Sequence, residues 1–380
     1  MQHRSYGKTG LKVSALGFGA MRRPFYGGDR DKPGDEELAS ACLHRYLELG
    51  GNLIDTARAY GDSERRVGEV LRSRREQVIL STKNASLAPL RYRPGYVFTP
   101  DLWQQHLEQS FEALGVDYID LYHVHDLSWE QYTGHFAQPG GPLDLVQRHL
   151  DDGSIRHLCF SCHDTPENLI QLIDEGVFSG MLVQYNLLDR HNEEALAHAH
   201  ERGLGVNIMG PVAGGRLASP SERLTGMLEN VKSVPDIALR FVLSSPHVSC
   251  ALSGMNDLQM VEENCATASR EEPLTPEEHE LVVKTLEDCQ RLLGLYCTGC
   301  GYCLPCPQGV AIPDVLAALN LERVWGLTDS ARRAYRRLSA GDKPRDASLC
   351  VECGECEGKC PQKLPIMEQL REAHSLLSVE

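Results

Sequence analysis

The sequence predicts an α/β protein, a closed parallel (β/α)8 barrel followed by a small, mainly helical domain. Between residues 15 and 270, short apolar runs alternate with amphipathic segments, which is the pattern of repeated βα units. The chain contains eight such apolar runs, and eight βα units in about 250 residues are the size of a closed barrel. From residue 294 onward the composition changes, because two dense runs of cysteine appear. An open doubly wound sheet is the alternative for the first region.

The expected strands are nearly continuous apolar runs, as in parallel strands that are buried on both faces. They cover residues 15–21, 53–57, 78–83, 118–125, 155–161, 180–186, 205–211 and 249–254. The turn Gly17-Phe18-Gly19 gives little support to the open sheet. It lacks the third glycine and the downstream acidic residue of a dinucleotide-binding fingerprint.

The expected helices have apolar residues on one face and polar caps at their N-termini. They cover residues 35–49, 63–74, 101–114, 166–175, 192–202 and 235–244. Thr-Pro pairs at 99, 165 and 275 each open a helix, because threonine accepts an N-cap hydrogen bond and proline lacks the N–H that would need a partner. Thr275 and Glu278 also form the capping box of a long helix. We therefore place the barrel at 1–274, a connecting helix at 275–293 and the cysteine-rich domain at 294–380, with further helices at 314–325 and 329–338.

In both cysteine runs, three cysteines are spaced by two residues and a fourth precedes proline. The runs contain Cys297, Cys300, Cys303 and Cys306, and then Cys350, Cys353, Cys356 and Cys360. This is the ligand pattern of a pair of 4Fe–4S clusters, in which the Cys-Pro cysteine binds the other cluster. We therefore expect one cluster on Cys297, Cys300, Cys303 and Cys360, and the other on Cys350, Cys353, Cys356 and Cys306. The first run departs from the bacterial ferredoxin pattern in one place: two residues stand before Cys306 where the ferredoxin run has three.

Two other interpretations of the cysteine runs are zinc sites with four cysteines each and disulfides. Zinc does not explain why both runs end in Cys-Pro, and nothing in the sequence marks the chain as secreted. The six cysteines outside the runs are expected to be free thiols, which suits a reducing cytoplasm.

The net charge of −15 at pH 7 argues against nucleic acid and anionic membranes as partners, because both would repel the protein. No stretch is long enough to span a bilayer, and the N-terminus lacks the apolar region of a secretory signal. Acidity would suit a basic redox partner protein. The four arginines at 332, 333, 336 and 337 are expected to form a solvated helix face.

Polar residues end three successive predicted strands, at the edge where barrel enzymes place their catalytic groups. Asp55 and Tyr60 follow the second strand, Lys83 ends the third and His125 ends the fourth. Together they form a proton-transfer set: the aspartate holds the lysine ammonium, which lowers the tyrosine pKa, while the histidine orients a carbonyl. His123 lies one layer deeper on the same strand, where a core polar role is favoured. Cys159 and Cys162 are expected to be buried structural thiols.

In these motifs the first 270 residues resemble an aldo-keto reductase. The matching segments include 6–19, 52–64, 81–83, 117–125, 155–161, 184–186 and 263–264. The resemblance implies that Asp55, Tyr60, Lys83 and His125 are the catalytic tetrad. It also implies that Ser161 and Gln184 bind the nicotinamide amide and that Glu263 and Asn264 bind the adenine. The whole chain resembles a branch of that family fused to a two-cluster ferredoxin-type domain.

The departures from the family pattern lie at the cofactor. Cys162 replaces an asparagine, Met209 replaces the aromatic residue that stacks on nicotinamide, and Gly254 and Met260 replace basic residues that hold the 2′-phosphate of NADP. Loss of a charged clamp removes a strong type of hydrogen bond. NADH, weakly bound NADPH and another hydride source therefore stay open. No flavin motif is visible, and a bound flavin is not excluded.

The leading hypothesis is an oxidoreductase that interconverts a small-molecule carbonyl and alcohol, with two 4Fe–4S clusters for electron transfer or structure. Nicotinamide transfers two electrons as hydride whereas each cluster takes one, so the route between them needs a further component. The alternative is an electron-transfer or binding subunit on a barrel that no longer uses nicotinamide.

Overall fold

The computed structural model covers residues 1–380 and describes all of them except 23, 26–33, 295–296, 298–299 and 380. The chain divides into two compact units. One, the barrel unit, consists of Met1–Ala213 and Leu239–Pro273. The other, the cluster unit, consists of Gly214–Ala238 and Leu274–Glu380, so a segment from the middle of the chain belongs to the C-terminal unit.

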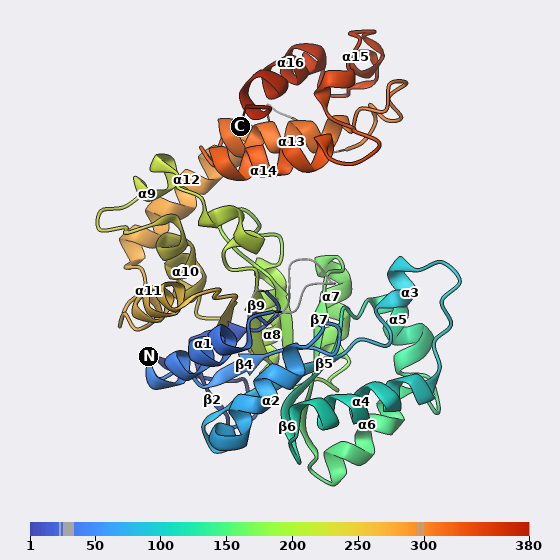
Figure 1. The fold of residues 1–380 in the computed structure, drawn as a ribbon, viewed down its shortest axis with the longest axis vertical. Helices are drawn as coiled ribbons and strands as arrows, with labels where there is room; N and C mark the ends of the chain where they lie inside the picture. The colour runs from blue at the N-terminus through green and yellow to red at the C-terminus, as the bar shows by residue number, and fades with distance from the viewer. Residues whose placement is uncertain (23, 26–33, 295–296, 298–299, 380) are drawn as a thin grey trace. The chain divides into compact units, whose positions relative to one another are not determined.

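The barrel unit is built on eight parallel strands that close in the order β10-β3-β4-β5-β6-β7-β8-β9 (Figure 1). Closure confirms the predicted barrel and excludes the open sheet, because β3 pairs with β4 on one side and with β10 on the other. The strands are β3 (Leu16–Gly19), β4 (Leu53–Asp55), β5 (Ile79–Asn84), β6 (Ile119–Val124), β7 (Ile155–Cys162), β8 (Gly180–Gln184), β9 (Gly205–Met209) and β10 (Cys250–Ser253).

Helices follow the strands, and those of the barrel surround the strands on the outside (Figure 1). Up to the barrel's last helix they are α1 (Glu36–Glu48), α2 (Ser63–Arg74), α3 (Pro89–Tyr92), α4 (Pro100–Leu114), α5 (Trp129–Gln131), α6 (Pro142–Asp151), α7 (Pro166–Asp174), α8 (Glu193–Arg202), α9 (Glu222–Thr225), α10 (Val234–Ser244) and α11 (Leu258–Ala268). Then come α12 (Pro276–Gly294), α13 (Ile312–Arg323), α14 (Thr328–Ser339), α15 (Glu355–Lys359) and α16 (Ile366–Leu377). The sequence analysis did not predict α6, α11 and α16, nor the short helices α3, α5, α9 and α15.

The threonine caps form as their sequence predicts. Thr99 and Thr165 each accept a hydrogen bond from the backbone N–H three residues on, and proline follows each at the first helical position. At the start of α12, the Glu278 carboxylate accepts from the Thr275 N–H at 3.0 Å, and the Glu278 N–H donates to the Thr275 hydroxyl at 3.2 Å. Both halves of the capping box are therefore present.

A short antiparallel hairpin, β1 (His3–Ser5) with β2 (Lys12–Ser14), precedes the barrel and was not predicted. The turn between these strands carries Tyr6, which is fully buried against the first residues of β8 and β9. A Cβ atom at Gly180 or Gly205 would stand 2.3 or 2.4 Å from the Tyr6 side chain. Glycine at the start of these two strands therefore leaves room for the tyrosine ring, which fills the N-terminal end of the barrel interior.

The cluster unit is mainly helical, and its apolar core lies between α13, α14 and α16. Val315, Leu319, Tyr335 and Leu370 are almost completely buried there, and cysteines of both runs pack against the same core. The Tyr335 hydroxyl accepts the Ala347 N–H at 3.1 Å and lies 2.8 Å from His374 Nδ1, so it ties α14 to the segment before the second run and to α16.

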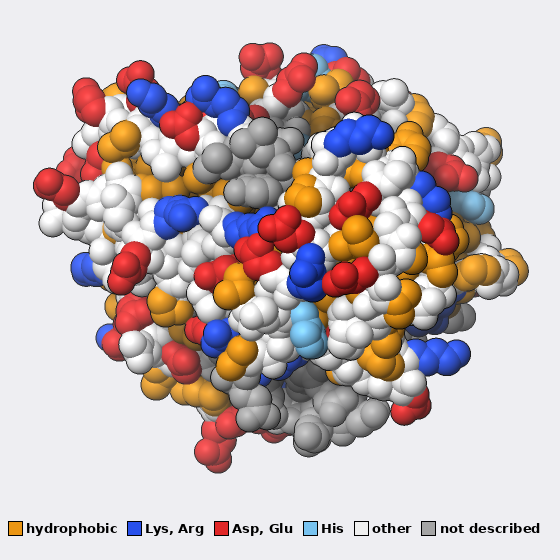
Figure 2. All heavy atoms as spheres, turned by 90° about the horizontal axis from the view of Figure 1, so that it is seen from above, with side chains coloured by type: hydrophobic (Ala, Val, Ile, Leu, Met, Phe, Trp, Pro, Cys, Tyr) orange, Lys and Arg blue, Asp and Glu red, His pale blue; other side chains and the backbone are white. Residues whose placement is uncertain are grey.

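The surface of the molecule is mixed in charge on the face that Figure 2 shows. Acidic side chains lie among basic ones on this face, and apolar side chains are scattered between them. The net charge of −15 is therefore not gathered into one acidic area on this face. Among the described residues, no helix combines the length and the apolar character that crossing a membrane requires.

Candidate active site and cluster sites

The four residues of the predicted proton-transfer set lie at the C-terminal ends of three neighbouring strands. Asp55 is the last residue of β4, Tyr60 lies in the turn that follows, Lys83 is in β5 and His125 directly follows β6. Because the strands are parallel and adjacent in the barrel, their C-terminal ends share one rim. The structure therefore brings together all four side chains that the sequence singled out.

A buried ion pair forms the centre of the site. Lys83 Nζ donates to Asp55 Oδ2 at 2.5 Å and to the Thr56 carbonyl at 2.7 Å, and the two charged side chains are 1% and 6% exposed. Burial lowers the pKa of Lys83, but the Asp55 and Tyr60 side chains outweigh it, so the pKa lies above the ordinary value of 10.5. The lysine is therefore an ammonium at neutral pH, held in one position.

Tyr60 lies over this ammonium. Lys83 Nζ is 4.9 Å from the centre of the Tyr60 ring. Burial raises the pKa of Tyr60 above its ordinary value, and the Lys83 charge opposes that rise. The phenol therefore keeps its proton at neutral pH while a cation stands ready to stabilise the phenolate, as a proton donor requires.

His125 completes the set. Its ring meets the Tyr60 ring edge to face, with the centroids 5.6 Å apart. Burial, and then the Lys83 charge, lower the pKa of His125 to about 3, so the imidazole is neutral. Its Nδ1 is buried and has no hydrogen-bond partner among the described residues. A neutral imidazole in this position can orient a substrate oxygen by hydrogen bonding without competing for the proton.

His123 lies inside the barrel behind this set, in the core position that its spacing predicts. It is fully buried, and its Nδ1 is 3.3 Å from the hydroxyl of Ser81, which in turn donates to Asp55 Oδ1 at 2.7 Å. Sequence analysis missed Ser81. The strand pattern does indicate this position: Ser81 is two residues before Lys83, so both side chains face the barrel interior.

Three of the residues expected to hold nicotinamide lie on adjacent strand ends. Ser161 is 3% exposed near the end of β7, and its hydroxyl accepts the Asp126 N–H at 2.8 Å. Gln184 ends β8 and pairs in register with Met209 at the end of β9. The Gln184 carboxamide makes no hydrogen bond with the described residues, so it could pair with an amide of a bound molecule. Met209 packs against the apolar interior of the barrel.

Glu263 and Asn264, expected to hold adenine, lie on α11. Asn264 Nδ2 donates to the Ser253 hydroxyl at 3.2 Å, at the end of β10, while Glu263 accepts from Gln259.

Cys162 is buried, and its sulfur accepts the Asp164 N–H at 3.3 Å. Together with the fully buried Cys159, it is thus one of the structural thiols that we expected.

Arg22, which sequence analysis missed, lies beside Gly254, one of the two positions where the family pattern has a basic residue. Met260 is 37% exposed, and Gly254 has no side chain to offer. A Cβ atom at Gly254 would stand 3.4 Å from Cγ of Arg22, so the arginine that follows β3 lies against this position. Gly254 and Met260 both follow β10. The residue pattern along that strand cannot indicate an arginine that follows a different strand, β3.

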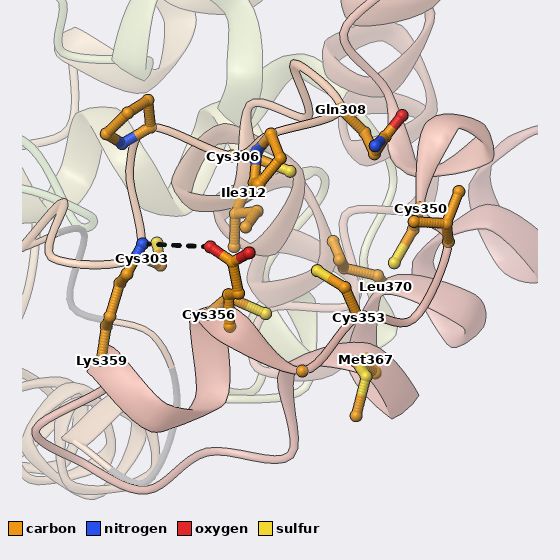
Figure 3. A pocket seen from close by; sticks show the side chains of 15 residues that line it. Cys303, Cys306, Gln308, Ile312, Cys350, Cys353, Cys356, Lys359, Met367 and Leu370 are labelled. Atoms are coloured by element: carbon orange, nitrogen blue, oxygen red, sulfur yellow. Dashed lines mark ion pairs between the residues drawn. The ribbon is translucent and has the colours of Figure 1, made fainter.

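The eight run cysteines line two cavities in the cluster unit. One is lined by Cys297, Cys300, Cys303 and Cys360. The other is lined by Cys306, Cys350, Cys353 and Cys356, and Cys303 lines this cavity as well (Figure 3). The Cys-Pro cysteine of each run therefore lines the cavity of the other run, the arrangement that the spacing predicts.

The cysteines surround volumes and do not converge on points. Within the described part of the chain, no three Cys, His, Asp or Glu side chains are grouped as ligands of a single metal ion. A tetrahedral zinc site draws four sulfurs to about 2.3 Å from one ion. In a 4Fe–4S cluster each thiolate binds a different iron, so a cavity between the sulfurs is what such a group needs.

Comparison with known proteins decides the family. The description "Aldo/keto reductase family" matches residues 15–287, which is more than half of the chain. The chain belongs to the aldo/keto reductase family. It is accordingly an oxidoreductase, and its family implies a small-molecule carbonyl or alcohol as substrate. Residues 296–364 match the description "4Fe-4S dicluster domain", so this aldo/keto reductase carries an iron–sulfur domain after its barrel.

Relatives of this aldo/keto reductase match its barrel. L-galactose dehydrogenase of Arabidopsis thaliana is 27% identical over 305 residues, covering 73% of this chain and 91% of the relative. NADH-specific methylglyoxal reductase of Escherichia coli is 25% identical over 311 residues, with 68% and 91% covered. A solved aldo-keto reductase from Bacillus halodurans superposes with a TM-score of 0.62 and 27% identity, covering 75% of this chain and 96% of that one.

Proposed function

We propose that this aldo/keto reductase interconverts a carbonyl and an alcohol with Tyr60 as the proton donor and acceptor. The observation that carries the proposal is the Lys83 ammonium, which pairs with Asp55 at 2.5 Å and faces the Tyr60 ring at 4.9 Å. In reduction, a hydride adds to the carbonyl carbon, the carbon–oxygen π bond opens onto oxygen, and the Tyr60 hydroxyl protonates that oxygen. The resulting phenolate is stabilised by Lys83.

The other residues of the site hold the reactants. The His125 ring meets the Tyr60 ring edge to face, so the neutral imidazole can orient the substrate oxygen toward the phenol. NAD(P)H, when bound, supplies the hydride. Ser161 and Gln184 would hold its amide, Met209 would lie against the nicotinamide ring, and Glu263 and Asn264 would hold the adenine. The aliphatic part of Arg22 lies against Gly254, and we propose that its guanidinium takes the place of the missing basic residue toward a phosphate-bearing cofactor.

We further propose that the cluster unit holds two 4Fe–4S clusters. One is on Cys297, Cys300, Cys303 and Cys360, and the other on Cys306, Cys350, Cys353 and Cys356. The division of these cysteines between two cavities supports the assignment. The clusters serve electron transfer, to a partner protein or through a bound flavin, or else they serve structure.

Two experiments test these proposals. Protein purified without oxygen should contain about eight iron atoms per chain and should bleach with dithionite, whereas zinc in place of iron would refute the cluster proposal. Titration of NADH and NADPH against intrinsic fluorescence should show binding, and Tyr60→Phe should abolish carbonyl reduction while leaving that binding unchanged. Full activity of Tyr60→Phe would refute the role of Tyr60.

The electron-transfer subunit is the second candidate, and the replacement of the clamp by Gly254 and Met260 favours it. It predicts that neither nicotinamide binds below millimolar concentration. The role of the clusters is then determined by testing whether NAD(P)H reduces them anaerobically, with and without added flavin. Reduction that requires flavin would identify an electron-transfer path, and no reduction in either condition would favour a structural role.

A further inference from the structure

Two buried side chains that the proposed chemistry does not use lie directly behind Asp55. Ser81, in β5, and His123, in β6, are both fully buried inside the barrel. The Ser81 hydroxyl is 2.7 Å from Asp55 Oδ1 and 3.3 Å from His123 Nδ1. The opposite carboxylate oxygen, Asp55 Oδ2, accepts from Lys83 at 2.5 Å. Both oxygens of the carboxylate are therefore held, one by the lysine and one by the serine.

The directions of these hydrogen bonds follow from the protons available. A carboxylate only accepts, so the single hydroxyl proton of Ser81 is used by Asp55. The contact between Ser81 and His123 must then run the other way, with His123 Nδ1–H donating to the Ser81 oxygen. Burial, and then the Lys83 charge, lower the pKa of His123 well below its ordinary value, so the ring is neutral and carries one proton. That proton lies on Nδ1, and Nε2, which has no partner among the described residues, is unprotonated.

We propose that Ser81 and His123 are positioning residues for the reaction, acting as a relay of oriented hydrogen bonds that fixes the Asp55 carboxylate against Lys83. The inference rests on the proposed role of Tyr60 and extends it inward, from His123 through Ser81, Asp55 and Lys83 to the phenol. All four residues behind Tyr60 are buried. Because water is excluded, their partial charges act on one another more strongly than they would at the surface.

The relay acts on Tyr60 through the position of Asp55. Without the Ser81 bond the carboxylate turns more freely, so it holds the Lys83 ammonium less firmly beside Tyr60 and leaves the phenolate less stabilised. Loss of the bond should therefore raise the pKa of Tyr60 and weaken it as an acid. Other titratable groups that act on Asp55, Tyr60 or His123 are the side chains of Tyr6, Arg22, His125 and Cys250.

The first test reads the histidine itself and needs no cofactor or activity. Nitrogen NMR of histidine-labelled, cluster-loaded protein should show a neutral ring with its proton on Nδ1 whose signal disappears in His123→Asn, which assigns it to His123 among the 15 histidines of the chain. In Ser81→Ala the same ring loses its acceptor, so its Nδ1–H resonance should shift. An Nε2–H tautomer or a protonated ring at His123 in the unsubstituted protein would overturn the proposal.

The second test compares substitutions that keep or remove each hydrogen bond. Ser81→Ala should lower kcat for carbonyl reduction about tenfold with KM unchanged, the effect of losing one hydrogen bond to a charged group. It should also move the pH profile of alcohol oxidation to higher pH by about one unit. Ser81→Thr keeps the hydroxyl and should restore both. At the next position, His123→Leu should resemble Ser81→Ala, whereas His123→Asn, whose amide can donate from the place of Nδ1, should resemble the unsubstituted protein.

Ser110 in α4 provides the matched control, because it is equally buried and its hydroxyl has no partner among the described residues. Ser110→Ala should leave kcat and the pH profile unchanged. Equal losses in Ser81→Ala and Ser81→Thr, or an unchanged pH profile in folded Ser81→Ala, would overturn the relay. Failure of the proposed function is separate: Tyr60→Phe would stay active, while the NMR test of His123 would still give its result.

Discussion

Replacement of Lys83 by methionine tests the buried ion pair at the centre of the site. The substitution keeps the length of the side chain and removes its charge, so the Asp55 carboxylate, 6% exposed, retains Ser81 as its side-chain partner and loses its counter-ion. Removing one partner of a buried pair costs about 3–5 kcal/mol, because the remaining charge is buried without compensation. The same change removes the cation that stabilises the Tyr60 phenolate, and general acid–base contributions of this kind are worth about 10²–10⁴-fold in rate.

The measurement is urea unfolding followed by tryptophan fluorescence under anaerobic conditions. In a Trp325→Phe background the two remaining tryptophans, Trp103 and Trp129, both lie in the barrel unit, so the signal reports the barrel. Arg45→Met is the surface control: Arg45 pairs with Glu262 at 2.9 Å, but the side chains are 39% and 55% exposed, and loss of such a pair costs about 0–1 kcal/mol.

The effect of this substitution on stability should depend on pH. The pKa of Lys83 in the folded protein lies above 10.5, so its stabilising contribution is fully present below that pH and is lost as the pH rises through the folded value. The stability gap between the unsubstituted protein and Lys83→Met should therefore be constant near neutral pH and narrow in strong alkali. Replacing Asp55 by asparagine as well should recover part of the stability and none of the activity. A cost below about 1 kcal/mol for Lys83→Met would refute the reasoning.

Three further predictions concern other parts of the molecule. Because burial and the Lys83 charge lower the pKa of His125 to about 3, the unfolded chain binds a proton there from pH 6.5 downward, so stability should fall as the pH drops through that window and fall less in His125→Gln, measured by urea unfolding at several pH values. Cys353→Ser should reduce iron from about eight to about four atoms per chain, measured by iron analysis, and an unchanged content would contradict its assignment. Ser330→Ala should speed hydrogen exchange in residues 216–225 but not in the barrel strands, because it removes bonds to Ser219 and Arg216, whereas exposed Arg337→Ala should not.

Much of the barrel could be predicted because its signals are local. Every predicted strand overlaps an observed one: six contain it entirely, whereas β5 and β7 each run one residue beyond the predicted end. At β6 the observed strand is shorter than predicted, and His125 follows it. The β1–β2 hairpin could not be predicted from local signals of this kind. Its strands are three residues long, and its packing depends on contacts of Tyr6 with Gly180 and Gly205, which lie 174 and 199 residues later in the chain.

In the site, the sequence indicated residues that share a rim and missed those whose role depends on contacts across the barrel. The set of Asp55, Tyr60, Lys83 and His125 follows from strand ends alone. The bond from Ser81 to Asp55 and the approach of Arg22 to Gly254 depend on neighbouring strands in the closed barrel, which spacing along one strand does not reveal. In α14 the arginines at 333, 336 and 337 are exposed, as expected, but Arg333 also donates to Ser219 at 2.8 Å, a contact that the sequence did not indicate.

The segment Gly214–Ala238 also bears on how this protein is made. Ser219 lies 2.8 Å from Ser330, which is 111 residues further along the chain, and Ser221 donates to the Trp325 carbonyl at 2.6 Å. At about 5–20 residues per second, a ribosome needs about 5–20 s to deliver these partners after the segment itself has emerged. During that interval a nascent chain exposes a segment whose partners do not yet exist. The last quarter of translation therefore completes a part of the protein whose first residues come shortly after β9.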